Sequence, residues 1–96
     1  MLERIYRITV SCGGIDEEQS LAACREVVDE FSYRPWHQNG ASNWINSRLY
    51  LVTDNDYDSD GLALLDEFSD AVCACIDLTT SGTIDFKVES VVTLSD

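Results

Sequence analysis

Long apolar runs are absent from this sequence, which limits where the protein acts. No stretch approaches the roughly 18 consecutive apolar residues that a membrane-spanning helix needs. The first ten residues, MLERIYRITV, include Glu3, Arg4 and Arg7, whereas a secretory signal peptide has an uninterrupted apolar region. Four cysteines in a chain without an export signal are typical of reduced, buried thiols. We therefore predict a cytoplasmic protein that does not enter a membrane.

Basic residues are scarce. Six Lys and Arg residues face 18 Asp and Glu residues, which gives a formal net charge of −12 over 96 residues. Between Leu49 and Phe86 the chain carries acids but no base. Such a surface repels nucleic acid phosphates and anionic membranes, and it attracts basic partners over a Debye length of about 8–10 Å. The composition argues against direct nucleic acid binding and favours a basic protein as partner.

Motifs for catalysis and for metal binding are also few. His37 is the only histidine, and no spacing places a nucleophile or a carboxylate beside it. The sequence has no G-x-S-x-G, no phosphate-binding glycine loop and no C-x-x-C. We predict a protein without catalytic activity and without a cofactor. The alternative is a small-molecule site or an enzyme centred on His37.

What the sequence does contain is periodic. Side chains alternate over residues 3–12, as in a strand with one buried face. A helix follows, with Asp16 as its cap, and ends before Pro35, which lacks a backbone N–H. The residues expected to face the core are Tyr6, Ile8 and Val10 of the strand, and Leu21, Cys24, Val27, Val28 and Phe31 of the helix.

The middle of the chain predicts a hairpin. Asn39-Gly40 and Asn46-Ser47 are both turn sequences, and Asn-Gly is the stronger signal in general. We nevertheless prefer the turn at Asn46-Ser47, because it leaves two strands of similar length, Trp36–Trp44 and Arg48–Asp54. With the other turn the first strand would be squeezed against Pro35.

The remaining residues predict a second helix from about Asp60 and a last strand from Thr83 to Thr93. The resulting order, β-α-β-β-α-β, predicts one α+β domain over residues 1–96 with the ferredoxin-like sandwich, in which two right-handed crossovers place both helices on one face of a four-stranded antiparallel sheet. A three-stranded sheet is the alternative, if residues 36–44 form a loop. The residues expected to face the core are Leu62, Leu65, Phe68, Val72 and Ile76 of the helix, and Ile84, Phe86 and Val88 of the strand.

One short stretch matches a calcium-loop pattern, D-x-[DN]-x-[DN]-G-x5-E, with candidate ligands Asp56, Asp58, Asp60 and Glu67. The residues before it alternate like a strand, and the helical stripe already begins inside it, so its flanks do not fit such a site. We expect the acids to stabilise a helix start instead, with Ser59 or Asp60 as the cap. A calcium-binding module remains the alternative.

Acids on the two helices provide the main indication of function. If both helices share one layer, their carboxylates form a single anionic surface, with tryptophans as anchors. We predict a small non-catalytic binding protein that occupies a basic partner, as inhibitors, immunity proteins and nucleic-acid mimics do; the partner would be a nuclease toxin or another nucleic-acid-binding effector. The predicted contact residues are Glu26, Asp29, Glu30, Trp36, Trp44, Asp66, Glu67 and Asp70.

Overall fold

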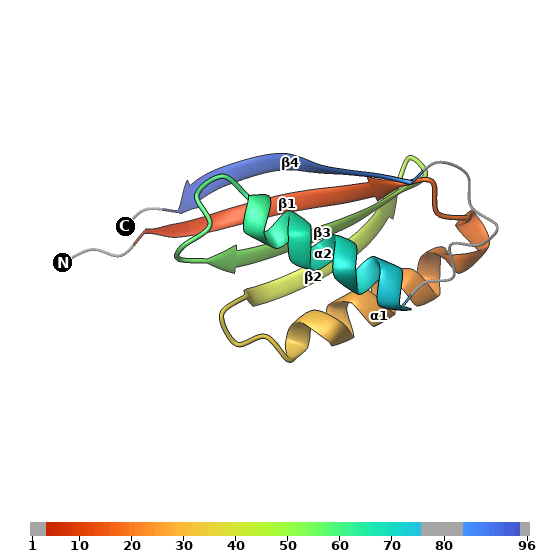
Figure 1. Ribbon diagram of the computed structural model, residues 1–96, viewed down its shortest axis with the longest axis horizontal. Helices are drawn as coiled ribbons and strands as arrows, with labels where there is room; N and C mark the ends of the chain where they lie inside the picture. The colour runs from red at the N-terminus through yellow and green to blue at the C-terminus, as the bar shows by residue number, and fades with distance from the viewer. Residues whose placement is uncertain (1–3, 76–83, 95–96) are drawn as a thin grey trace.

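A four-stranded antiparallel sheet and two helices form the computed structural model, which describes residues 4–75 and 84–94 (Figure 1). The strands lie in the order β2-β3-β1-β4, and every neighbouring pair is antiparallel. The predicted α+β class is confirmed, and the three-stranded alternative is wrong because residues 38–45 pair with the next strand. The elements are β1 (Ile5–Gly13), the 3-10 turn η1 (Glu17–Gln19), α1 (Ser20–Ser32), β2 (Gln38–Ile45), β3 (Arg48–Asn55), α2 (Leu62–Cys75) and β4 (Asp85–Leu94).

Both helices lie on the same face of the sheet (Figure 1). α1 packs over β2 and β3, α2 packs over β1 and β4, and the helices contact each other. Neither helix in the described part of the chain is long and apolar enough to cross a membrane.

Alternation along the strands separates this inner face from the open face. Ile8 and Val10 of β1 and Leu49 and Leu51 of β3 are fully buried beneath the helices, as their spacing predicts. The inward residues predicted for the last strand, Ile84, Phe86 and Val88, also pack against this core. Phe68 of α2 meets Phe86 edge-on, with 6.0 Å between the ring centroids.

The predicted apolar stripes of the helices are partly wrong. Leu21 of α1 is 71% exposed and Leu62 of α2 is 59% exposed, although both were expected in the core. Several apolar stripes coexist on these helices, and the sheet selects the one whose residues interlock with its own side chains. Ile76 lies outside the described residues. The helical residues that are buried are Ala23, Val27 and Phe31 of α1 and Leu64, Phe68, Ala71 and Val72 of α2.

The hairpin turns at Asn46-Ser47, as predicted. Ile45 pairs directly with Arg48, and Asn46 and Ser47 have φ values of 51° and 63°. Two central residues with positive φ in a two-residue loop are typical of a type I′ turn. The competing Asn39-Gly40 sequence forms a bulge in β2 instead, where the register shifts and Asn39 has a φ of 57°.

We predict that Ser47→Gly stabilises the protein by up to about 1 kcal/mol, because glycine adopts positive φ without a steric penalty and part of that gain is offset by the freer unfolded chain. Urea denaturation measures the change in unfolding free energy. Ser59→Gly, outside the hairpin, is the control and should not stabilise. A loss of stability for Ser47→Gly would contradict the turn assignment.

Candidate functional site

Side chains from two loops and α2 converge on one carboxylate, that of Glu67. His37 Nε2 lies 3.0 Å from Oε2, and Arg34 Nε lies 3.1 Å from Oε1. Trp36 donates its indole N–H over 3.3 Å, and the Tyr57 hydroxyl donates over 3.4 Å. We call these five residues the Glu67 cluster. Charge-assisted hydrogen bonds are stronger than neutral ones, so the cluster ties α2 to the segment between α1 and β2.

Arg34 connects the cluster to the end of α1. Its guanidinium lies over the Phe31 ring, 4.6 Å from the centroid, and donates to the Glu30 carbonyl over 3.0 Å. It also forms an ion pair with the Glu30 carboxylate at 3.4 Å. Arg34 is therefore occupied inside the fold, and two of the predicted contact residues, Glu30 and Glu67, share its charge.

Asn55 sets the orientation of the buried His37 ring. The Asn55 Oδ1 accepts the backbone N–H groups of Tyr57 and Asp58, at 3.2 and 2.9 Å. Its Nδ2 therefore points toward His37 Nδ1, 3.3 Å away, which must accept. His37 Nε2 then carries the hydrogen donated to Glu67. Both ring nitrogens of His37 are therefore engaged by side chains of the fold.

Burial and the Glu67 carboxylate together raise the pKa of Tyr57 to about 12, with burial the larger cause. The phenol therefore remains a hydrogen-bond donor at neutral pH. Trp36 and Tyr57 both lie near the His37 ring, with centroid distances of 6.0 and 6.1 Å, and both are about half exposed. The cluster thus presents two aromatic side chains at the surface.

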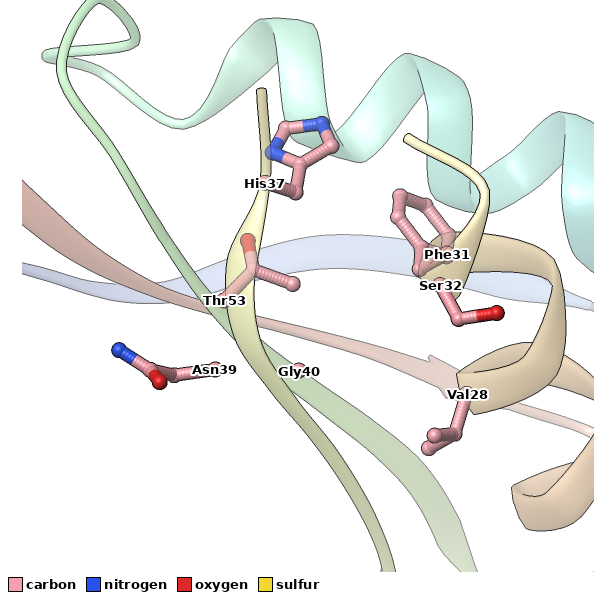
Figure 2. A pocket seen from close by; sticks show the side chains of 7 residues that line it. All are labelled: Val28, Phe31, Ser32, His37, Asn39, Gly40 and Thr53. Atoms are coloured by element: carbon pink, nitrogen blue, oxygen red, sulfur yellow. The ribbon is translucent and has the colours of Figure 1, made fainter. Parts of the chain in front are cut away.

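Behind the His37 ring lies a cavity of about 150 Å³ between α1 and the bulge of β2 (Figure 2). Val28 and Phe31 of α1 form one wall, and Asn39, Gly40 and Thr53 belong to the sheet. The Thr53 hydroxyl is buried and has no hydrogen-bond partner among the described residues. Figure 2 shows this hydroxyl pointing toward His37. The sequence-based interpretation of His37 had no means of locating this cavity.

The stretch that matches the calcium pattern forms the entry into α2. Asp58 is buried and accepts the backbone N–H groups of Ala63 and Leu64 over 3.2 and 2.8 Å, while Asp60 accepts that of Leu62 over 3.0 Å. The prediction of Ser59 or Asp60 as the cap is therefore only partly right. Asp60 accepts one N–H group at the start of α2, whereas Asp58 accepts two. Glu67, the last acid of the calcium pattern, belongs to the Glu67 cluster.

Gly61, the glycine of the same pattern, is required by packing. Its φ is +78°, and a Cβ there would lie 2.9 Å from Val88 Cγ1 and 3.1 Å from Ile8 Cγ2. Within residues 4–75 and 84–94, no group of three or more His, Cys, Asp or Glu side chains is arranged to hold a metal ion.

The open face of the sheet carries a network of paired charges. Arg7 makes two bonds of 2.9 Å to the buried Asp54 carboxylate, which also accepts from Asn39. The hydrogen bond from Arg7 is the main cause of the lowered pKa of Asp54. Arg48 donates to Asp85 over 2.9 Å, and this hydrogen bond is the main cause of the lowered pKa of Asp85. Arg48 and Lys87 both lie beside the Glu89 carboxylate.

The predicted contact residues fall into three environments. Glu26 and Asp29 of α1 and Asp66 and Asp70 of α2 are exposed on the helix layer; we call these four the acidic helix face. Glu30 and Glu67 lie inside the fold's own ion pairs. Trp36 is 49% exposed just before β2, whereas Trp44 packs partly against the core near the other end of that strand. The two tryptophans therefore do not share a patch.

The thiols also differ from one another. All four cysteines are free; Cys12 is buried, but Cys73 is exposed, so the prediction that all are buried is wrong. Burial raises the pKa of Cys12 to about 12, which keeps this thiol protonated and unreactive.

Sequence reasoning missed Arg34, Thr53, Asn55 and Tyr57 as parts of the site. Arg34, Asn55 and Tyr57 contact Glu67 or His37 across sequence separations that periodicity does not detect, and Thr53 joins the site only as part of the cavity lining. No protein family, characterised protein or solved structure matched this chain in the comparisons.

We predict that Asp58→Ala destabilises the protein by about 1–3 kcal/mol, since it leaves buried helix N–H groups without an acceptor. Asp60→Ala should cost about 0.5–1 kcal/mol through the loss of one exposed bond. Asp56→Asn, which relieves repulsion at an exposed position, should be neutral or stabilising. Urea melts with calcium and with chelator measure all three. A loss of stability for Asp56→Asn that appears only in the presence of calcium would instead support the calcium-binding alternative.

We predict that Asp54→Asn destabilises the protein at pH 7 by about 1–3 kcal/mol, because a buried carboxylate loses charge-assisted hydrogen bonds. The folded pKa of Asp54 lies below its ordinary value of 3.8, so its contribution is present above about pH 4 and is lost as the pH falls through the folded pKa. The difference from wild type should shrink accordingly in melts at decreasing pH. The exposed control Asp66→Asn should show little effect at pH 7. A difference for Asp54→Asn that stays constant down to pH 2 would contradict the assignment.

Proposed function

We propose that this chain is a small acidic, non-catalytic binding protein that occupies a basic protein partner through the outer surface of its helix layer. The observation that carries the proposal is the separation of charge between the two layers. On the open sheet face, Arg7, Arg48 and Lys87 pair with Asp54, Asp85 and Glu89. The acidic helix face has no ion pair within the described residues.

Paired and unpaired charges are therefore distributed unevenly between the two layers. Arg7, Arg34, Arg48 and Lys87 are paired with neighbouring acids, whereas the four carboxylates of the acidic helix face form no ion pair among the described residues. A partner with a basic surface is attracted to the helix layer before contact, which raises its association rate. A nucleic-acid-binding protein, such as a nuclease, has such a surface, and an acidic inhibitor competes for it as a nucleic acid would.

Trp36 supplies a suitable anchor at the border of this surface. Half of the side chain is exposed, and its N–H bond to Glu67 orients the ring. Tyr33 and Tyr57 are exposed on the adjoining loops. Binding energy at protein interfaces concentrates in a few aromatic residues of this kind, whereas surrounding charges contribute steering. Trp44, packed against the core, is not part of this proposed anchor.

We also propose the ferredoxin-like label for the fold. The support is the β-α-β-β-α-β element order together with the strand order β2-β3-β1-β4 and helices on one face. A cytoplasmic location is proposed with it, because unpaired thiols are typical of a reducing compartment.

The test compares two variants with the same net charge. Glu26→Gln/Asp29→Asn/Asp66→Asn/Asp70→Asn neutralises the acidic helix face. Glu17→Gln/Glu18→Gln/Asp56→Asn/Asp60→Asn removes as many exposed acids outside it. Proteins retained from lysate of the source cell on each immobilised form are identified in low and high salt. We expect wild type and the second variant to retain a basic protein, and the first variant to retain it about tenfold less well. High salt should weaken this retention.

Three results would contradict the proposal: a retained partner that is acidic, retention that is insensitive to salt, or an equal loss in both variants. The last would show that net charge, and not its placement on the helices, governs the interaction. Trp36→Ala tests the anchor separately from the charges. It should speed dissociation of the basic partner and leave the salt dependence of partner association unchanged.

A further inference from the structure

β2 forms one border of the sheet, and its outer side has no neighbouring strand among the described residues (Figure 1). Alternate residues of such a strand direct their N–H and C=O groups away from the sheet. All residues of β2 except Ser42 and Trp44 are exposed, and the strand pairs in regular register from Ala41 to Ile45. A regular, exposed border of this kind is a template for a further strand.

The opposite border of the sheet, β4, is protected against such pairing. Three exposed charged residues, Asp85, Lys87 and Glu89, follow one another at every second position of β4. The register with β1 also shifts between Thr9 and Val10, which leaves Glu89 as an extra residue in β4. Charged side chains and bulges are the usual means by which proteins keep edge strands from pairing. β2 has a bulge only at its start and carries no charged side chain, so its border is open to a partner strand.

Charge indicates which kind of chain pairs with β2. Residues 35–47 are the longest stretch of the sequence without Asp, Glu, Lys or Arg, in a protein whose net charge is −12. A basic strand would gain no electrostatic attraction from this stretch. A second copy of this chain is repelled by the acids elsewhere on the molecule but meets no like charge along this stretch. The border therefore suits self-association better than contact with a basic partner.

The side of α1 that borders β2 is also free of acids. Val28 and Ser32 line the cavity between α1 and β2, which places them on that side (Figure 2). Arg25 and Leu21 lie one and two turns before Val28 on the same side of the helix. Leu21 is 71% exposed, and a second α1 placed alongside would cover it.

From these observations we propose that two copies of this chain associate by pairing their β2 strands antiparallel about a twofold axis at Asn43. Asn43 is the central residue of the regular part of β2, so Ala41 of each copy lies opposite Ile45 of the other. The two sheets become one continuous sheet with both α1 helices on its inner face. The acidic helix face is not part of this contact, so the inference is independent of the proposed binding of a basic protein.

Sedimentation equilibrium of the wild type, from micromolar to millimolar concentration, measures the association. We expect a monomer–dimer equilibrium that high salt strengthens, because salt screens the repulsion between two chains of net charge −12. This is the reverse of the salt dependence expected for a basic partner. Amide hydrogen exchange locates the contact. Every second amide within residues 41–45 should become more protected as the protein concentration rises, and the amides of β4 should not.

Two charge substitutions at the axis test the twofold symmetry. Asn43 is exposed, so Asn43→Lys and Asn43→Asp should both fold. Each places two like charges opposite one another in the dimer and should weaken self-association about tenfold. An equimolar mixture of the two variants should associate again, because lysine then faces aspartate. Ser90→Lys and Ser90→Asp, at an exposed position of β4, make the same changes in net charge and should leave the dimer unchanged.

Several results would overturn the proposal. One is a wild type that stays monomeric at millimolar concentration in high salt. Another is a dimer that the Asn43 variants do not weaken, or whose loss their mixture does not reverse. Protection of β2 amides that appears only with an added lysine-rich peptide would assign the border to a basic strand instead. Partner retention by the acidic helix face is unaffected by these outcomes, so the two proposals fail separately.

Discussion

The carboxylate of Glu67 is the interaction on which this end of the molecule depends. It lies on α2 but accepts hydrogen bonds from Arg34, Trp36 and His37, which precede β2, and from Tyr57, which follows β3. A partly buried carboxylate is stable only when such donors replace its water. In return it sets the ring orientations of Trp36 and His37, and Asn55 extends the arrangement to the backbone of the loop before α2.

Four of the six basic residues form ion pairs within the fold. Arg34 holds the helices together, and Arg7, Arg48 and Lys87 neutralise acids on the open sheet face. Because these four bases are paired with other acids, the four carboxylates of the acidic helix face have no ion-pair partner within the described residues. The acidic helix face is therefore one part of the chain's net charge of −12 that the fold leaves unneutralised.

The bulge in β2 links the fold to the cavity. Asn39 adopts positive φ there and bonds to Asp54 on the open face, while Gly40 contributes no side chain to the inner face. The space that remains reaches Thr53 and the His37 ring. The cavity and the Glu67 cluster thus share His37, with the cavity behind the ring and the exposed Trp36 beside it.

The sequence by itself determined the element order, the hairpin turn, the inward faces of the strands and the excess of acid, because alternation, turn residues and charge are local properties. Only the tertiary structure decided which helical stripe is buried, since the sheet chooses among overlapping apolar faces, leaving Leu21 and Leu62 outside. It also decided that Asp58 caps α2 and that Glu67 contacts His37. Such contacts join residues far apart in the chain, and no local period encodes the distance between them.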